Sequence, residues 1–338
     1  MINLPSSVCR AFEADKDYLF ILQRRQIIKQ FKLFPTLLIS IMAFFLISES
    51  YLSAAETFWD DFDGNSLDPA KWGYQDRNWP IGQTWFRGAP TISGGIATFE
   101  HHTYNPYDPG NSCLGQEIYT HAAFSPGPGF GVEVRVRLRS PISSGLVSSV
   151  FGYTDKAMPY GSPIWSDEVD FEFLSNQVNN PPENIGHRVF VASWNDFGAP
   201  GSGYYDSVHH WGENPVVPTL DLTEFNTFKI LWSADSVQWY WDPDQIRGQD
   251  LYPDILISET SSVIPDEPLT LRMNFWASTY DWLVAWDSGM QPAFNSADDV
   301  VCYYDVDYIG AMGIPAPASV VLVAIGLLSL RCIRRLRY

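Results

Sequence analysis

The chain has 338 residues, with 21 Lys or Arg against 39 Asp or Glu, so its formal net charge is −18. Nucleic acid, anionic lipid and highly sulfated polysaccharides are disfavoured as partners, because binding such anions needs clustered positive charge. Residues 56–312 are the most acidic part, with 11 basic and 35 acidic residues, and they hold all 13 Trp. So many aromatic side chains suit a groove in which ring faces stack on sugars.

The first 55 residues predict an export signal. Arg24 and Arg25 precede an apolar run over residues 33–47, and Ser53-Ala54-Ala55 offers small residues to a signal peptidase. We therefore expect the protein at the cell surface or outside the cell. The alternative is an uncleaved membrane anchor, although the run is shorter than the roughly 20 residues that a membrane span requires.

Residues 56–312 predict a single all-β domain. Short segments of alternating polarity are separated by turns rich in Gly, Pro, Asn and Asp, and no long amphipathic helix is found. The clearest strand covers residues 132–138, and further strands are expected at 189–194, 227–232, 237–241, 270–276 and 300–309. Many short strands without helices favour a sandwich of two sheets, which we expect to be a monomer.

The cysteines of this domain are Cys113 and Cys302, since Cys9 and Cys332 lie in the terminal segments. In an oxidising compartment the two could form one disulfide, although nothing in the sequence shows that they are close. No Cys/His spacing indicates zinc and no Gly-rich loop indicates phosphate binding. We therefore expect no cofactor to be required for catalysis.

The most informative strand begins at Glu168. Because successive side chains of a strand point to opposite faces, Glu168, Asp170 and Glu172 share one face, while Val169 and Phe171 begin the other. Three neighbouring carboxylates repel one another and raise each other's pKa values. The alternative is an acidic strand that merely faces solvent.

Two neighbouring carboxylic acids with different pKa values can together catalyse cleavage of a glycosidic bond. One protonates the leaving oxygen, while the other attacks the anomeric carbon or activates water. The Cα atoms of Glu168 and Glu172 are roughly 13 Å apart on an extended strand. Retention requires carboxyl groups about 5–5.5 Å apart, so both side chains must lean inward on a curved sheet.

Residues 313–338 form a tripartite tail. Ile314-Pro315-Ala316-Pro317 is followed by an apolar run over residues 318–330 and by four arginines. This tail resembles the PEP-CTERM sorting signal of Gram-negative bacteria, with Ile-Pro-Ala-Pro where that signal has Val-Pro-Glu-Pro. The resemblance implies transient membrane anchoring and removal by the sorting protease of that system. A plain single-span anchor is the alternative.

Residues 167–174, Asp-Glu-Val-Asp-Phe-Glu-Phe-Leu, resemble the catalytic strand of glycoside hydrolase family 16, in the unbulged form of lichenases and xyloglucan transglycosylases. The similarity extends over nearly all of residues 57–310, through segments such as Trp239-Tyr240-Trp241-Asp242 and Met273-Asn274-Phe275-Trp276. It implies a concanavalin A-like β-jelly-roll of two curved antiparallel sheets with a concave substrate cleft, and a retaining mechanism.

The resemblance also implies roles for individual residues. Glu168 corresponds to the nucleophile, Glu172 to the general acid/base and Asp170 to the helper between them. The expected substrate-binding residues are Glu117, Asn274, Trp276, Trp282 and, more loosely, Asn78. The family often binds a structural calcium ion, for which Asp307 and the Gly94 carbonyl are the candidates.

The chain departs from lichenases at several positions in the expected cleft. Tyr119 stands where lichenases have an Arg two residues after the sugar-binding Glu, and Ser166 stands where they have an aromatic residue, with Trp165 displaced by one. On the next strand, Ala192 and Trp194 replace an Asn and a Tyr. We retain Trp165 and Trp194 as substrate-binding candidates and expect altered sugar subsites.

The function that follows is an exported, retaining endo-glycosidase acting on a neutral, lichenan-like 1,3-1,4-β-glucan. One alternative is a transglycosylase acting on a β-glucan or xyloglucan. Another is a non-catalytic surface protein that binds glycans, although such a protein would be expected to have lost one of the three acids.

Overall fold

In this computed structural model, the described residues are 58–127, 130–139, 142–156, 165–178, 188–197, 202–210, 220–244 and 253–313. They all belong to the unit that begins at Glu56. The expected export signal and the tail beyond residue 313 lie outside these ranges, so both stay predictions. Within the described ranges, no helix is both long and apolar enough for a membrane span.

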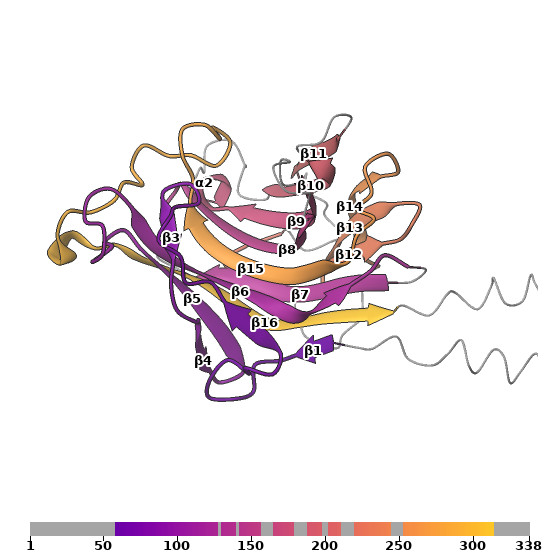
Figure 1. The fold of residues 1–338 in the computed structure, drawn as a ribbon, viewed down its shortest axis with the longest axis horizontal. Coiled ribbons are helices and arrows are strands. Elements are labelled where there is room, and N and C mark those ends of the chain that lie inside the picture. The colour runs from indigo at the N-terminus through magenta and orange to yellow at the C-terminus, as the bar shows by residue number, and fades with distance from the viewer. Residues whose placement is uncertain are drawn as a thin grey trace, which may run out of the picture. The chain divides into compact units, whose positions relative to one another are not determined.

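Two curved sheets build the described domain (Figure 1). The first sheet contains seven antiparallel strands in spatial order. They are β11 (Gly203–His210), β10 (Arg188–Phe197), β9 (Trp165–Leu174), β8 (Leu146–Lys156), β15 (Leu269–Ala277), β6 (Cys113–Phe124) and β2 (Trp72–Tyr74). The helix α2 (Ser175–Val178) follows β9 directly.

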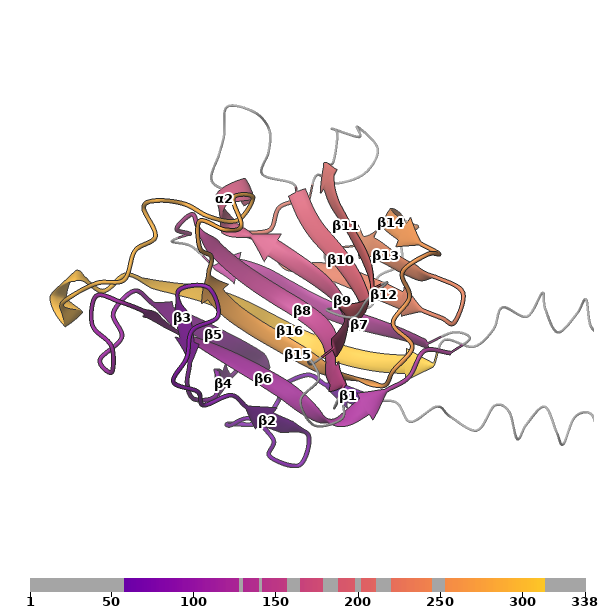
Figure 2. The same ribbon diagram turned by 45° about the horizontal axis from the view of Figure 1, so that its top comes forward.

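The second sheet runs from β4 (Thr91–Ser93) and β5 (Ile96–His102) through β16 (Val301–Gly313), β7 (Phe130–Arg139), β12 (Asn226–Trp232) and β13 (Val237–Asp242) to β14 (Ile255–Thr260). The strand β1 (Phe58–Asp60) pairs with β16, and β3 (Thr84–Phe86) pairs in parallel with β6. A short 3-10 helix, η2 (Ser296–Asp298), precedes β16. Figure 2 shows the two sheets lying one over the other along the curve of the domain.

The alternation along β9 fills the core between the sheets. Val169, Phe171 and Phe173 are at most 2% exposed, and the rings of both phenylalanines pack against Phe228 on β12. The indole N–H of Trp239 on β13 donates to the backbone oxygen of Asp170 at 2.8 Å. These contacts fix β9 to the opposite sheet, so its other face is free to line a cleft. The all-β prediction, and a strand in each expected segment, are confirmed.

The disulfide suggested for Cys113 and Cys302 does not form, because both are buried free thiols. Strand β5 lies between β6, which carries Cys113, and β16, which carries Cys302. Two strand spacings separate their backbones by about 9–10 Å, beyond the reach of a disulfide. Burial raises the pKa of the Cys113 thiol to about 12, so this side chain behaves as a small apolar group.

Candidate active site

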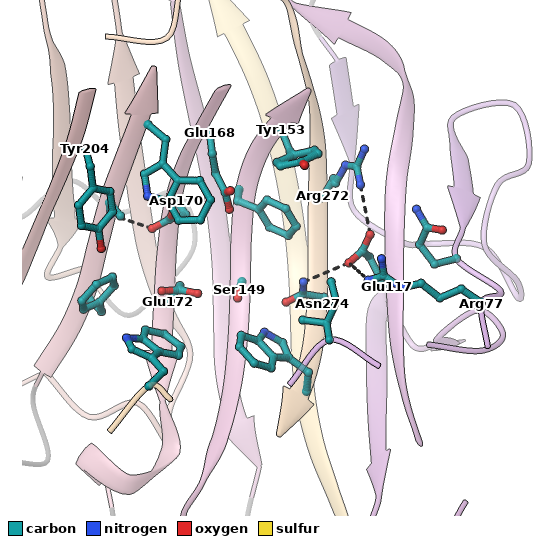
Figure 3. A pocket seen from close by; sticks show the side chains of 18 of the residues that line it. Arg77, Glu117, Ser149, Tyr153, Glu168, Asp170, Glu172, Tyr204, Arg272 and Asn274 are labelled. Atoms are coloured by element: carbon teal, nitrogen blue, oxygen red, sulfur yellow. Dashed lines mark hydrogen bonds and ion pairs between the residues drawn. The ribbon is translucent and has the colours of Figure 1, made fainter. Parts of the chain in front are cut away.

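The acidic face of β9 opens into a cleft of about 690 Å³ on the first sheet. Glu168, Asp170 and Glu172 all line it (Figure 3). The three side chains alternate with the core residues of the same strand, as the two-residue period requires. The cleft therefore combines a rigid strand, anchored through its apolar face, with a row of carboxylates on its open face.

The antiparallel register places the cleft residues in rows that cross the strands. In one row, Glu172 lies opposite Phe190 on β10 and opposite Ser149 on β8. Ser149 lies opposite Asn274 on β15, which in turn lies opposite Glu117 on β6. Residues that are far apart in the sequence thus form one continuous line across the floor of the cleft.

A second row crosses the sheet one pair of residues farther along. Asp170 lies between Ala192 on β10 and Phe151 on β8, and Phe151 lies opposite Arg272 on β15. Arg272 lies opposite Tyr119 on β6. Because side chains of the two rows point to the same face, residues of the first row contact residues of the second.

Burial sets the protonation of the carboxylates. Asp170 is 3% exposed and accepts a hydrogen bond from the Ala192 N–H at 2.8 Å. Desolvation, followed by the charge of Glu172, raises the pKa of Asp170 well above its ordinary value. Desolvation, followed by the charge of Glu168, likewise raises the pKa of Glu172. The site therefore holds a protonated carboxyl group at a pH where a free carboxylic acid would be ionised.

Glu117 lies at the far end of the first row and is 2% exposed. Its Oε1 accepts from Nη1 of Arg272 at 3.3 Å, and its Oε2 accepts from Nδ2 of Asn274 at 3.2 Å. The guanidinium of Arg77 lies 3.5 Å from Oε2. Arg272 also places its guanidinium 4.6 Å from the centre of the Tyr153 ring. We call Arg77, Glu117 and Arg272 the arginine cluster (Figure 3).

Aromatic rings form the walls of the cleft. Trp276 stacks on Trp282 with ring centres 5.9 Å apart, and Phe190 meets Trp282 edge to face. A Cβ at Gly82, whose φ is +55°, would come within 2.7 Å of the Trp276 ring, so only glycine lets this loop support the indole. Flat apolar faces beside carboxylates and amides are suited to binding sugar rings, which have apolar faces and polar edges.

The other aromatic group lies beside Glu168, where Trp194 occupies the opposing position on β10. The Trp194 ring stacks on Phe197 with centres 4.4 Å apart and lies 5.9 Å from the Tyr204 ring. A buried carboxylate on β9, Asp167, accepts from the backbone N–H of Asp196 at 2.8 Å. Asp196 has a φ of +53°, so Asp167 stabilises the irregular end of β10 that brings Trp194 and Phe197 together.

Most of the predicted site residues converge. Besides the three acids, the lining includes five predicted substrate-binding residues, namely Glu117, Asn274, Trp276, Trp282 and Trp194. Trp165 and Asn78 are not among the lining residues. Trp165 is an odd number of positions from Glu168, so it faces the other way, and the Asn78 Oδ1 accepts from Nη2 of Arg87. The correction for Trp165 follows from strand parity.

Several lining residues were missed from the sequence, namely Arg77, Arg272, Tyr153, Phe190 and Tyr204. Arg272 had a signal, because it alternates with Asn274 and Trp276 along the same strand. Arg77 and Tyr204 had none, since their positions depend on a loop and on a hairpin pairing. Tyr119 stands where the family resemblance leads one to expect an Arg. Arg272, which lies opposite Tyr119 on β15, places a positive charge beside Glu117 instead.

The calcium site suggested for Asp307 and the Gly94 carbonyl stays a prediction. The Asp307 carboxylate accepts from Nη1 of Arg135 at 2.6 Å, so a guanidinium already neutralises it. Gly94 has a φ of +62° and lies in the turn between β4 and β5. Among the described residues, no three His, Cys, Asp or Glu side chains are grouped as metal ligands would be. Calcium therefore enters no step below.

The sequence profile of the glycosyl hydrolases family 16 matches residues 119–293. Xyloglucan endotransglucosylase/hydrolase protein 2 of Arabidopsis thaliana is 27% identical over 172 residues, covering 48% of this chain and 49% of that protein. Crh-like protein 2 of Botryotinia fuckeliana is 27% identical over 145 residues, covering 43% of this chain and 26% of that protein. The matches thus span half or less of these curated relatives.

Solved structures share the fold. A prokaryotic β-1,3-1,4-glucanase (lichenase) from a mouse hindgut metagenome superposes with a TM-score of 0.52 at 20% identity, covering 76% of this chain and 99% of that one. An endo-β-1,3-glucanase from Pyrococcus furiosus gives a TM-score of 0.54 at 19% identity, covering 76% and 93%. The predicted β-jelly-roll of two curved antiparallel sheets is therefore confirmed.

Proposed function

This chain belongs to the glycosyl hydrolases family 16, and from that premise we propose that it is a retaining endo-β-glucanase whose reacting groups are Glu168 and Glu172. The observation that carries the proposal is the common face of β9, where Glu168, Asp170 and Glu172 line one cleft. A non-catalytic glycan-binding protein would have no use for three mutually repelling carboxylates in a partly desolvated cleft.

In the first step, a Glu168 oxygen attacks the anomeric carbon while Glu172 gives its proton to the leaving glycosidic oxygen. The glycosidic bond breaks, and a covalent glycosyl ester on Glu168 forms. In the second step, ionised Glu172 takes a proton from water, whose oxygen attacks the same carbon and releases Glu168. Two inversions give net retention, and both glutamates return to their starting protonation states.

The raised pKa of Glu172 suits the role of acid, because a group must hold its proton to donate it. Asp170 lies between the two glutamates on the same face. Its hydrogen bond from the Ala192 N–H holds its carboxyl group in place, where it can interact with Glu172 in both protonation states. Asp170 thus acts as a positioning and electrostatic residue in this scheme.

We propose a lichenan-like 1,3-1,4-β-glucan backbone as the substrate. The unbulged catalytic strand and the Asn274 and Trp276 positions support it, while Tyr119, Ala192 and Trp194 imply subsites that differ from those of lichenases. Transglycosylation is the second candidate, favoured by the relative named as a xyloglucan endotransglucosylase/hydrolase. In that reaction a sugar hydroxyl replaces water in the second step.

The proposal also assigns a role to each part of the chain. Residues 1–55 direct export, residues 56–312 form the catalytic domain, and residues 313–338 act as the sorting signal. The export and sorting roles rest on the apolar runs, the small residues near position 55 and the basic tail. The site would then act on polysaccharide at the cell surface or outside the cell.

The central experiment uses Glu168→Ala. The variant should lose turnover of lichenan while keeping its melting temperature, and added azide should restore cleavage of an activated aryl glycoside with inverted product. Proton NMR of the first lichenan product of the wild type should show the β-anomer. Wild-type activity in Glu168→Ala, or the α-anomer appearing first, would overturn the mechanism. Longer products formed from short glucans would favour transglycosylation.

A further inference from the structure

The arginine cluster holds more positive charge than its own carboxylate neutralises. Arg77 and Arg272 share Glu117, and the ion pairs measure 3.5 and 3.3 Å. Within the described residues, neither guanidinium forms an ion pair with a second carboxylate. One end of the cleft therefore carries a net positive charge, in a protein whose formal net charge is −18.

This surplus charge is largely withdrawn from water. The side chains of Arg77, Arg272 and Glu117 are 13%, 20% and 2% exposed. Among the described residues, Nε and Nη2 of Arg77 are buried without a hydrogen-bond acceptor, and Nη2 has only the 3.5 Å ion pair with Oε2 of Glu117. Desolvation lowers the pKa of the Arg77 guanidinium, which shows that its environment disfavours the charge it carries. Burying a cation whose donors lack acceptors costs free energy, unless an anion pairs with its charge and accepts those hydrogen bonds.

The cluster is open to a ligand. Arg77, Glu117, Arg272 and Asn274 line the same cleft as the catalytic acids, and Oδ1 of Asn274 is a further buried atom without a partner among the described residues. Three strand spacings separate Glu117 from Glu172, which is about 14 Å across the sheet. A glucan chain bound along the row would therefore reach the cluster several sugars from the scissile bond.

We propose that the arginine cluster is a subsite for a sugar residue that carries an anionic substituent, a carboxylate or a sulfate ester. The proposal rests on the proposed function and revises one part of it, since the neutral backbone would carry acidic groups. The anion would accept from Nε and Nη2 of Arg77, a fork that matches the two oxygens of a carboxylate or sulfate. Glu117 and Asn274 would bind the hydroxyl groups of the same sugar.

Binding of a neutral sugar would leave the positive charge of the arginine cluster uncompensated and less hydrated. Its binding would expel water from around Arg77 and Arg272 without supplying a counter-charge, and the cost of an uncompensated charge increases as the site dries. The carboxyl groups on β9 cannot compensate, because three strand spacings separate that strand from Glu117 on β6. Binding of an anion would neutralise the surplus positive charge and would also provide acceptors for the buried donors of Arg77.

The test measures binding of matched oligosaccharides to the full chain carrying Glu168→Ala, so that nothing is cut. Three probes of equal length are compared by calorimetry, namely an unmodified β-glucan oligosaccharide, one with a C6 carboxylate and one with a C6 sulfate. An anionic probe should bind about tenfold more tightly than the neutral one. The preference should fall with rising salt. A preference for only one of them identifies the substituent.

Three further substitutions on this background decide the mechanism. Arg77→Gln should weaken binding of the anionic probes far more than binding of the neutral probe, and so abolish the anionic preference. Glu117→Gln should increase the preference, because it removes the competing carboxylate from both guanidiniums. Arg87→Gln is the control, since Arg87 pairs with Asp76 outside the cleft lining and its loss changes the net charge equally. It should change nothing.

Equal affinity for all three probes, or an equal loss of neutral and anionic binding in Arg77→Gln, would overturn the subsite. If Glu117→Gln does not fold by thermal melting, the Arg77→Gln and Arg87→Gln pair decides alone. Failure of the subsite leaves cleavage of unmodified lichenan by the wild type unaffected. A wild-type enzyme that cuts no glucan would instead refute the proposed function, while these binding measurements still test the site.

Discussion

The carboxylate of Asp170 is held by the backbone of Ala192, whose N–H donates to Oδ1 at 2.8 Å across the β9–β10 pair. This bond offsets part of the cost of burying Asp170 and keeps its side chain between the two glutamates. An amide oxygen at position 170 can accept the same hydrogen bond. The substitution Asp170→Asn should therefore remove the charge of this side chain while keeping the hydrogen bond that positions it.

Asp170→Asn is expected to lower kcat on lichenan by about ten- to a hundredfold with little change in melting temperature. Repulsion between charged neighbours is reciprocal, so loss of the Asp170 charge should lower the pKa of Glu172 and move the alkaline limb of the rate profile to lower pH. Asp170→Ala removes the acceptor as well and should also destabilise the fold. Identical rate profiles for wild type and Asp170→Asn would contradict the electrostatic role.

Protein stability should decrease as pH rises through the raised pKa values of Asp170 and Glu172. The folded state binds these protons more tightly than the unfolded chain, so their contribution is fully present below the ordinary pKa of a free acid and is lost above the folded pKa. Thermal melting between about pH 4 and 8 measures this slope.

The double substitution Asp170→Asn and Glu172→Gln should flatten that slope and raise the melting temperature at neutral pH by a few degrees, about what one kcal/mol does in a domain of this size. Glu224→Gln, at an exposed position, is the control and should change neither. A double variant that melts below the wild type at neutral pH would show that the two carboxylates are better satisfied than their burial implies.

Glu172→Ala should slow lichenan cleavage by about 10²–10⁴-fold, because the glycosidic oxygen then leaves without a proton. A dinitrophenyl glycoside needs no such proton and should lose far less in the glycosylation step, which pre-steady-state product release measures. The alkaline limb of the wild-type profile, which reports the raised Glu172 pKa, should disappear for that activated substrate. Equal losses on both substrates would assign Glu172 another role.

Gly82→Ala and Gly88→Ala form a matched pair. Both glycines have positive φ, +55° and +73°, but a Cβ at Gly82 would strike the Ala277 backbone oxygen and the Trp276 ring, whereas nothing lies within 4 Å of one at Gly88. Gly82→Ala should cost about 1–3 kcal/mol more in the free energy of unfolding. It should also raise the KM for lichenan. Denaturant melts and initial rates distinguish the two variants.

The domain boundaries can be tested by truncation. Residues 56–313 should fold and cut lichenan at the rate of the full chain, because β1 pairs with β16 as far as Ala311. Residues 61–313 should be strongly destabilised. That shorter chain lacks Trp59, which stacks on Tyr308 at 4.9 Å, and Asp60, which accepts from Nε1 of Trp72 at 2.6 Å. Equal melting temperatures would show that β1 is dispensable.

How much of the site could be predicted depends on whether the signal is local. The two-residue period of a strand is local, so Glu168, Asp170 and Glu172 on one face followed from the sequence. Trp165 is displaced by one position from the expected aromatic residue, and the same period puts it on the opposite face, outside the cleft lining. Register between strands is not local, so the pairing of Arg272 with Tyr119 and of Asn274 with Glu117 had no sequence signal.

The same limit applies to the cysteines and the loops. A third strand between Cys113 and Cys302 is a property of sheet order, which their spacing along the chain does not encode. Arg77 reaches the cleft from a loop that precedes β3, where no periodicity constrains the side chains. The family resemblance implied the fold, the candidate acids and Glu117, but it did not imply the two arginines that pair with Glu117.

The place of β15 in the first sheet also constrains how the protein acquires activity. This strand is made late in synthesis, yet it pairs with β8 on one side and β6 on the other, both made much earlier. Until residues 269–277 arrive, the two earlier strands have no shared partner, and neither the row of cleft residues nor the arginine cluster exists. A nascent chain that ends before β15 should therefore be inactive towards polysaccharide, and closing the sheet around this late strand should be among the slow steps of folding.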